Sequence, residues 1–468
     1  MKDNKKGFTL IELLAVIAIL AILMLLVIPR LVKSIKSSKK DTFYDNVTLI
    51  YNTAILEYVD DNAQNDEYCD TCSNNLGNKI PNKFEYKVKF EEDKLIYIRI
   101  TDKEYIYVKS DKNGINKKDL NKDDVKEYDP NTPSKDEDSK SETLIEKLLN
   151  DNPTISTRTN FSTAFTTNTA NTLYKATENG TDVYYFAGRD TTSTPINNWI
   201  KFGKNSSNQD LYWRIIRTNS DGSIRLLYHG TSTTATDAYI GKSKFNEKDN
   251  DSMYVGYMYG TSGSQESNRT NANDSTIKTL IDNWYASNMT SYTKYLSTTA
   301  VYCNDREVGS GTYSATGSKF YYAAYTRLYT NKTPTYDCTN DNDKFTVDAS
   351  SGNGKLTYPI ALMTADEIAY AGGVAFNNAP MWYYTNSSFK SSTGTTYWWS
   401  LSPNDWRGGY ATSWYVLVSG TPGRLVYNNV YYSNGVRPVV SLKSCTLYRT
   451  GNGTSETPYE IEMNGRCK

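Results

Sequence analysis

The sequence predicts an α+β protein built from a long N-terminal helix, a small antiparallel sheet and a large β-rich mixed domain. Three observations lead to this prediction. An apolar run begins at Phe8 and passes into helically spaced apolar residues that extend to Asp60. Short alternating runs follow between Phe84 and Ser110. From about Thr154 onward, strand-like runs lie in a portion rich in Tyr, Thr, Asn and Ser.

The first forty residues are the most informative part of the chain. A short basic leader, Met1–Gly7, precedes Phe8–Ile28, which is apolar except for Thr9 and Glu12. As a helix, this segment spans about 30 Å, which is enough to cross a bilayer. A carboxylate at membrane depth costs roughly 2.5–3.5 kcal/mol, so Glu12 needs a partner there.

Gly7 directly before the sequence FTLIE resembles the class III signal of type IV pilins and pseudopilins. The resemblance implies cleavage by a prepilin peptidase after Gly7 and N-methylation of Phe8. It also implies that Glu12 meets the N-terminal amine of a neighbouring subunit, and that Pro29 kinks or locally melts the helix. The expected partners are therefore prepilin peptidase, other pilin subunits and the membrane. The expected location is the cell membrane, crossed once, and an extracellular filament or the cell surface.

An ordinary signal anchor and a cleaved secretory signal peptide are the alternatives for this segment. The apolar run is too long for a signal-peptide core, and no small-x-small cleavage site follows it. An ordinary anchor requires neither Glu12 nor a glycine before Phe8. The positive-inside rule points the other way, because Arg30 and the lysines after it outnumber those of the leader. The motif and the cysteines outweigh that rule.

The chain has six cysteines, an even number that allows fifteen disulfide pairings. The simplest scheme pairs sequence neighbours: Cys69–Cys72, Cys303–Cys338 and Cys445–Cys467. The first pair also fits a redox or zinc motif, but a second C-x-x-C is lacking and the chain has one histidine. Structural disulfides imply an oxidising, extracytoplasmic setting.

Composition divides the 468 residues into regions and excludes some functions. The formal net charge is zero and there is no basic patch, so we expect no nucleic-acid partner. The 40 tyrosines favour an adaptable binding surface. The expected regions are a leader (1–7), a transmembrane or filament helix (8–60), a small antiparallel head (61–128), a polar linker (129–142) and a large extracellular domain (143–468).

Local patterns place the individual elements. In the small head, Phe84–Phe90, Lys94–Thr101 and Glu104–Ser110 predict a meander with tight turns. A short helix is expected at Leu144–Asn150. Beyond it, the predicted strands are Thr181–Ala187, Leu211–Thr218 and Ser223–Tyr228, with Asp221-Gly222 as the hairpin turn between the last two.

Two further helices carry capping signals. Ser275 can cap a helix over Thr276–Ala286, which has one apolar face. Thr364 and Glu367 fit a capping box, and Gly372 fits the end of that helix.

Several segments of the large domain resemble a set of surface proteins from low-GC Gram-positive bacteria. They include YWRIIRTNSDGSIRLLYHGTS (residues 212–232) and YPIALMTADEIAYAGG (residues 358–373). The pairing of YWWSLSP (397–403) with GVRPVVSL (435–442) resembles C-type-lectin-like folds related to formylglycine-generating enzymes. This resemblance implies a C-type-lectin-like fold. The cysteine pair and metal of those enzymes do not map onto this chain, so their activity does not carry over.

We expect no enzyme activity, because the sequence lacks the common catalytic motifs. His229, the one histidine, is expected to be structural. Carboxylates such as Asp366 and Glu367 are expected to cap a helix start. No metal site and no cofactor are expected. Calcium remains an alternative for polar loops that contain Asp249, Asp251, Asp341 and Asp343.

A tryptophan-rich stretch near the C-terminus supplies the ligand-binding candidates. Trp398, Trp399 and Trp414 are expected to pack in a core, whereas Trp406 lies in a turn-rich segment and is expected to be exposed. Exposed aromatic side chains beside polar ones suit sugar rings or protein partners. The candidates are Trp406, Arg407, Tyr410, Tyr427, Tyr431 and Tyr432. The composition of Tyr427–Asn434 also leaves open a retroelement-diversified loop, with a plain polar hairpin as the alternative.

These patterns favour a minor pilin-like surface protein, located at the filament tip, whose distal domain binds a host or environmental glycan or protein. The alternative is a structural or initiating pseudopilin that serves filament assembly, secretion or DNA uptake without binding a ligand.

Overall fold

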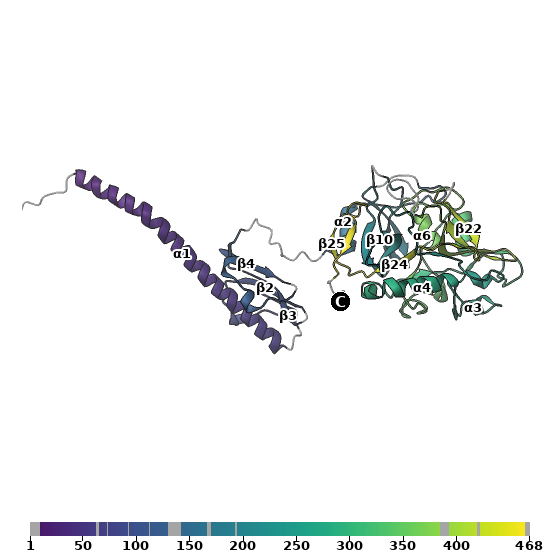
Figure 1. Cartoon of the computed structure of the whole chain (residues 1–468), viewed down its shortest axis with the longest axis horizontal. Coiled ribbons are helices and arrows are strands. Elements are labelled where there is room, and N and C mark those ends of the chain that lie inside the picture. Colours follow the sequence, from purple (N-terminus) through teal and green to yellow (C-terminus); the bar gives the residue numbers. More distant parts are fainter. Residues whose placement is uncertain are drawn as a thin grey trace, which may run out of the picture. The chain divides into compact units, whose positions relative to one another are not determined.

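The computed structural model of the chain describes residues 10–61, 65–72, 74–91, 93–111, 113–129, 142–165, 170–191, 194–383, 393–418 and 422–463. In the first helix, the side chains of residues 11–13, 16, 20–27 and 29 are outside this description. The chain folds as two compact units (Figure 1): the N-terminal unit, Met1–Ser139, and the C-terminal unit, Lys140–Lys468.

The N-terminal unit combines one long helix, α1 (Leu10–Asp60), with an antiparallel sheet that has five strands in the described residues. The strands pair in chain order, as a meander: β1 (Glu67–Cys69), β2 (Glu85–Glu91), β3 (Lys94–Thr101), β4 (Tyr105–Ser110) and β5 (Lys126–Glu127). The three alternating runs of the sequence are β2, β3 and β4, and β3 has the predicted bounds. The predicted meander is therefore confirmed.

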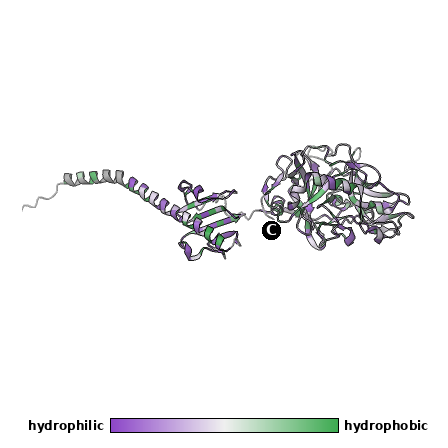
Figure 2. Cartoon of the chain, turned by 60° about the horizontal axis from the view of Figure 1, so that its bottom comes forward, coloured by the Kyte–Doolittle hydropathy of each residue, from purple (hydrophilic) through white to green (hydrophobic). Residues whose placement is uncertain are grey.

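The C-terminal half of α1 packs on this sheet. Phe43, Val47, Ile50 and Ala54 recur at helical spacing and are buried in a common core with the inward-facing strand residues. Figure 2 shows hydrophobic and hydrophilic residues alternating along these strands. The sheet has one polar face as a result, and its apolar face covers the helix.

The larger sheet of the C-terminal unit has ten strands in the part of the chain that the structure describes. Its main order is β19-β24-β11-β10-β8-β7-β6; β9 pairs with β10, β26 with β9, and β25 with β26. The strands are β6 (Thr154–Ser156), β7 (Thr172–Glu178), β8 (Thr181–Tyr185), β9 (Trp199–Lys204), β10 (Asp210–Thr218), β11 (Ile224–Gly230), β19 (Ile360–Leu362), β24 (Pro438–Leu442), β25 (Tyr448–Thr450) and β26 (Tyr459–Ile461). Strands β10 and β11 form the predicted hairpin and lie in the core.

A second sheet carries the tryptophan-rich stretch. Its described strands run in the order β12-β23-β20-β17-β16, with β21 on β20 and β22 on β21. They are β12 (Lys242–Ser243), β16 (Val308–Ser310), β17 (Phe320–Tyr322), β20 (Trp398–Trp406), β21 (Ala411–Val416), β22 (Leu425–Asn429) and β23 (Asn434–Gly435). Two short pairs lie outside both sheets: β13 (Met258–Tyr259) with β14 (Asn273–Asp274), and β15 (Tyr302–Cys303) with β18 (Lys344–Phe345).

Four of the five α-helices described in the C-terminal unit begin at a residue whose side chain caps them. The helices are α2 (Leu144–Asp151), α3 (Gln265–Asn268), α4 (Thr276–Asn288), α5 (Ala323–Tyr325) and α6 (Ala365–Tyr370). Ser275 Oγ accepts a hydrogen bond from the Lys278 N–H at the start of α4. Thr364 and Glu367 form the predicted capping box of α6. Together with α1 and the β-rich C-terminal unit, these helices confirm the predicted α+β class.

Candidate functional site

The processing and assembly residues lie at the start of the N-terminal unit. Gly7 and Phe8, the two sides of the expected cleavage site, are outside the described residues. Glu12 and Pro29 lie in α1, and their side chains are outside the described part of the structure. The helix backbone continues through Pro29 without a break, so the local melting implied by the resemblance is not seen there.

The first half of α1 exposes apolar side chains. Leu10, Leu14 and Ile17 are 79%, 60% and 57% exposed, and Leu31 and Ile35 are 55% and 56% exposed. Apolar side chains gathered in the open mark surfaces that another subunit or a lipid phase covers. No helix in the described residues carries an apolar stretch long enough to cross a membrane.

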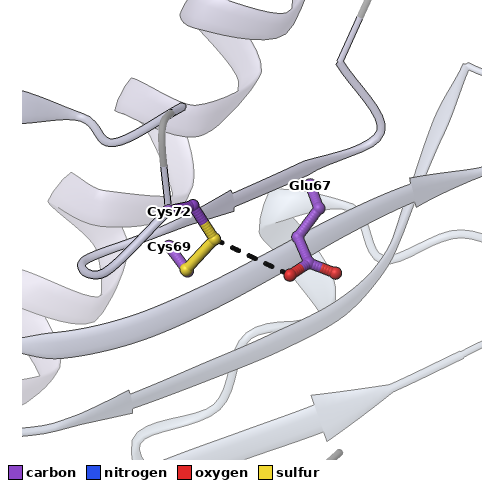
Figure 3. A group of neighbouring side chains, drawn as sticks. All are labelled: Glu67, Cys69 and Cys72. Carbon is purple, nitrogen blue, oxygen red and sulfur yellow. Dashed lines mark hydrogen bonds between the residues drawn. A yellow bond between two sulfur atoms is a disulfide. The ribbon is translucent and has the colours of Figure 1, made fainter. Parts of the chain in front are cut away.

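Cys69 and Cys72 form the predicted disulfide of the N-terminal unit (Figure 3). The Glu67 carboxylate lies beside them, with Oε1 3.8 Å from Cys72 Sγ. A disulfide sulfur carries no hydrogen, so this contact is not a hydrogen bond. Glu67 pairs with Lys87 and Lys89 at 3.1 and 3.6 Å. Among the described residues, Glu67, Cys69 and Cys72 are the one group of potential metal ligands whose ligand atoms lie close enough together to hold an ion. The two sulfur atoms are bonded to each other in the disulfide, whereas a metal ion binds cysteine as the free thiolate.

The second predicted bridge, Cys303–Cys338, joins positions 35 residues apart in the C-terminal unit. Cys445 is also disulfide-bonded. Its expected partner, Cys467, is outside the described residues. The structure therefore confirms two of the three pairings that join sequence neighbours.

The expectation that Trp406 is exposed is wrong. Trp406 is the last residue of β20 and is only 1% exposed. Its indole Nε1 donates a hydrogen bond to the Gly317 carbonyl at 3.0 Å. Trp398, Trp399 and Trp414 are buried as expected. These four indole rings therefore belong to the core of the C-terminal unit and present no stacking face to a ligand.

Three other candidates come together beside this core. Arg407 and Tyr410 lie at the turn between β20 and β21, where the Arg407 N–H donates to the Tyr410 carbonyl at 3.0 Å. The Arg407 guanidinium lies over the ring of Tyr427, 4.0 Å from its centroid. Tyr427 belongs to β22, which pairs only with β21 in the described sheet. Tyr410 is 39% exposed, and Arg407 and Tyr427 are half-buried.

Rings from two other segments extend this group. The Phe376 ring packs against Tyr427 and Tyr329, with centroids 6.0 and 5.0 Å apart. Tyr329 neighbours Tyr325 at 5.2 Å, and Tyr325 stacks on Tyr321 at 4.1 Å. We call this surface the aromatic face; it consists of Tyr321, Tyr325, Tyr329, Phe376, Arg407, Tyr410 and Tyr427. Tyr321, Tyr325, Tyr329 and Phe376 were not among the predicted candidates, because they are distant in the chain from Arg407, Tyr410 and Tyr427.

Phe376 occupies a strained backbone conformation at the centre of the aromatic face. Its φ is +65°, in the left-handed region that a bulky residue rarely adopts. Such a residue costs about 1–3 kcal/mol, and these residues concentrate at binding sites and switches. Its N–H donates to the Leu425 carbonyl at 2.8 Å, and its ring lies 5.7 Å from that of Trp414. Strand β22 and the core residue Trp414 therefore together hold the Phe376 ring in place.

Cations border the aromatic face. The Nζ atoms of Lys319 and Lys332 lie 4.5 and 5.1 Å from the ring centroids of two of its tyrosines. The Arg407 Nε is 3.1 Å from the buried carboxylate of Asp405. Burial raises the pKa of Asp405, although a hydroxyl hydrogen bond and the nearby cations oppose this effect. The surface thus combines half-buried rings with positive charge.

Tyr431 and Tyr432 are the most exposed candidates, at 47% and 60%. The Lys244 Nζ lies 3.6 Å from the Tyr431 ring centroid and 2.7 Å from Glu247 Oε2. These contacts link Tyr431 to a second feature, an open groove of about 460 Å³ that Glu247 lines together with one side of α4. That volume falls in the range of small-ligand pockets, roughly 300–1,000 Å³. None of the residues that line this groove was predicted from the sequence to bind a ligand.

A network of buried ion pairs lies inside the C-terminal unit. Arg217 pairs with Glu178 and Glu367 at 2.8 and 2.9 Å, and Arg225 pairs with Glu367 at 2.6 Å. Burial opposes ionisation of Glu367, but the two arginines outweigh it and lower its pKa. The enclosed cavity beside them is about 20 Å³, room for roughly one water. Glu367 is therefore both a helix cap and a core ion.

His229 also lies in the core, fully buried, with its ring centroid 4.3 Å from that of Trp199. Burial, with two arginines nearby, lowers its pKa well below the ordinary histidine value, so the ring is neutral. Of the calcium candidates, Asp343 is buried against Arg306 at 2.6 Å, and Asp249 accepts a hydrogen bond from Asn429.

Comparison with known proteins identifies one region of the chain. A family model described as the prokaryotic N-terminal methylation motif matches residues 2–28. No curated protein and no solved structure matches the chain. The C-type-lectin-like fold of the large domain therefore stays a prediction. The matched residues include Gly7, Phe8 and Glu12, and they run into the long helix that the sheet covers. The chain thus carries a type IV pilin-like signal, which implies processing by prepilin peptidase and assembly with pilin-type subunits.

Proposed function

We propose that the chain is a minor, tip-borne subunit of a type IV pilin-like filament, and that its C-terminal unit binds a host glycan or protein. One observation carries the proposal. The methylation motif at residues 2–28 continues into α1, and only the second half of that helix is packed on a sheet. The first half is thereby left for the membrane before assembly and for the filament core afterwards.

Processing prepares the assembly contact. Cleavage after Gly7 frees the Phe8 amine, and the Glu12 carboxylate of one subunit pairs with the amine of its neighbour. Two opposite charges attract more strongly in an apolar surrounding than in water, so a filament core suits this pair. The exposed Leu31 and Ile35 supply apolar contacts further along the helix.

The aromatic face supports ligand binding by the C-terminal unit. Tyrosine rings offer large contact area at low entropic cost, and each carries a hydroxyl. The strained Phe376 and the bordering lysines add shape and charge. None of these residues forms a catalytic constellation, so the proposal is binding without catalysis.

Immunogold electron microscopy of sheared filaments, with antibody raised against residues 154–468, tests the placement. We expect label at filament ends. Label spaced along the shafts would instead support the structural pseudopilin, and label confined to cell bodies would refute the filament role. Adhesion of purified filaments to host cells then tests the aromatic face. The double variant Tyr427→Ala with Tyr329→Ala should lower the number of bound filaments at least tenfold. The control Tyr432→Ala, which lies outside the aromatic face, should leave adhesion unchanged.

A further inference from the structure

We infer that the open groove between residues 246–248 and helix α4 binds a neutral saccharide of one or two rings. The inference goes beyond the aromatic face by assigning a second binding site and its ligand class to the C-terminal unit, and it rests on the proposed function for its biological setting.

Helix α4 provides one wall of the groove. Thr276, Thr279, Leu280 and Asn283 line it, and their spacing of three, four and seven residues places them on one helix face. The span from the first to the last is about 10 Å at 1.5 Å per residue. This wall presents two hydroxyls and one amide beside an apolar side chain. A sugar ring presents the same mixture of hydroxyl groups and C–H surface.

Asn246 in the facing wall supplies an unused hydrogen-bond donor. It lines the groove and is only 3% exposed. Its side-chain Nδ2 has no hydrogen-bond partner within the described chain. A ligand oxygen that accepts from this amide would satisfy a donor that the fold itself leaves unpaired.

The charges of the groove favour a neutral ligand. Glu247 is held by Lys244 at 2.7 Å and Asp274 by Lys278 at 3.2 Å. Lys248 is the remaining charged residue of the lining. The two carboxylates are therefore already paired with lysines, and a neutral saccharide adds no charge of its own to desolvate.

An aromatic ring completes the lining. Tyr259 is half-buried in the groove and packs edge-on against Tyr254, with centroids 5.3 Å apart. Sugar rings pack their C–H surfaces on such rings. Tyr431, linked to the groove through Lys244 and Glu247, places a second exposed ring nearby. The polar walls and these rings together fit a carbohydrate better than an apolar ligand.

The test uses the full chain, solubilised in a sugar-free zwitterionic detergent, on an array of immobilised galactose, N-acetylglucosamine, mannose and lactose with sialylated and sulfated counterparts. We expect binding to at least one neutral saccharide. Asn283→Arg, an exposed substitution that fills the groove, should weaken it at least tenfold. Ser287→Arg, one helical turn beyond the lining, should leave it within twofold.

Three results would overturn the inference: no neutral saccharide binds, only the sialylated or sulfated probes bind, or Asn283→Arg binds as well as the unchanged chain. Thr279→Arg provides a second blocked groove if Asn283→Arg fails to fold, as judged by its thermal unfolding. Filament labelling is scored separately. If saccharides bind but the immunogold label is absent from filaments, the filament role alone is refuted. If filaments adhere to host cells but no saccharide on the array binds, saccharide binding by the groove alone is refuted.

Discussion

At the scale of single residues, burial depends on partners that are remote in the sequence. Trp406 stands beside Asp405 and Arg407 and before two glycines, a neighbourhood typical of an exposed turn. In the structure, β20 extends through Trp406 and its indole reaches a carbonyl 89 residues away. The pairing of β20 with β17 decides this environment, and no local pattern encodes that pairing.

Replacement of Trp406 by alanine should destabilise the C-terminal unit by about 3–5 kcal/mol, because it empties a closely packed site and leaves the Gly317 carbonyl without its donor. Urea unfolding followed by circular dichroism measures the change. Tyr432→Ala is the control: it is 60% exposed, so its effect should stay within about 0.5 kcal/mol. Equal losses in the two variants would contradict the burial of Trp406.

Arg437 shows a related gap between sequence and structure. It lies in the GVRPVVSL segment and is fully buried, with guanidinium donors on the carbonyls of Tyr228 and Tyr383. Burial lowers its pKa to about 9. Arginine is rarely buried, so composition alone places such a residue at the surface. Its guanidinium therefore ties β11 and the loop at Tyr383 together from inside the core.

At the scale of elements, prediction succeeded where the signal was local. Alternation within runs of seven or eight residues predicted β2, β3 and β4, and the hairpin signal Asp221-Gly222 predicted β10 and β11. Capping residues gave the starts of α4 and α6. Pairing of distant strands, such as β24 between β11 and β19, could not be predicted, because it depends on which apolar faces meet after collapse.

The cap of α4 provides a test at this scale. Ser275→Ala should destabilise the C-terminal unit by about 1–2 kcal/mol, because Ser275 Oγ accepts from the Lys278 N–H and donates to the Tyr257 carbonyl. Ser287→Ala, an exposed serine near the other end of the helix, should change the free energy of unfolding by less than about 0.5 kcal/mol. A neutral Ser275→Ala would show that the cap contributes nothing to the fold.

The buried ion network should make the C-terminal unit sensitive to acid. The folded-state pKa of Glu367 lies below its ordinary value of 4.5 because Arg225 and Arg217 outweigh the effect of burial. Its ionisation therefore stabilises the fold above pH 4.5, and that contribution is lost as the pH falls through the lower folded-state pKa. Each tenfold difference in proton affinity corresponds to about 1.4 kcal/mol.

Glu367→Gln isolates this effect. At pH 7 it should cost about 3–5 kcal/mol, because Arg225 and Arg217 lose a buried carboxylate. Below pH 4.5, the free energy of unfolding should fall less steeply with decreasing pH in the variant than in the unchanged chain. Thermal unfolding at pH 7, 5 and 3 measures how stability depends on pH in the variant and in the unchanged chain. If both lose stability equally on acidification, groups other than Glu367 cause the acid sensitivity.

At the scale of the whole molecule, the sequence predicted an assembly module and a large β-rich portion, and the structure has two compact units. Neither surface of the C-terminal unit was fully predictable. The aromatic face combines rings from residues 321–329, 376 and 407–427, and the groove combines residues 243–248 with α4. Each segment is unremarkable by itself, so chain folding alone brings these side chains together.

Because the two units do not share a hydrophobic core, we expect two separate unfolding transitions. The Cys303–Cys338 bridge closes a loop of 35 residues, and its removal should cost about 3–4 kcal/mol through the entropy of the unfolded chain. Because the bridge lies within the C-terminal unit, Cys303→Ser with Cys338→Ser should lower the melting temperature of one transition in scanning calorimetry and leave the other in place. Cys69→Ser with Cys72→Ser should affect only the other transition, and by less, since its loop is far shorter. A single transition that both double variants shift would mean that the two units unfold together as one cooperative body.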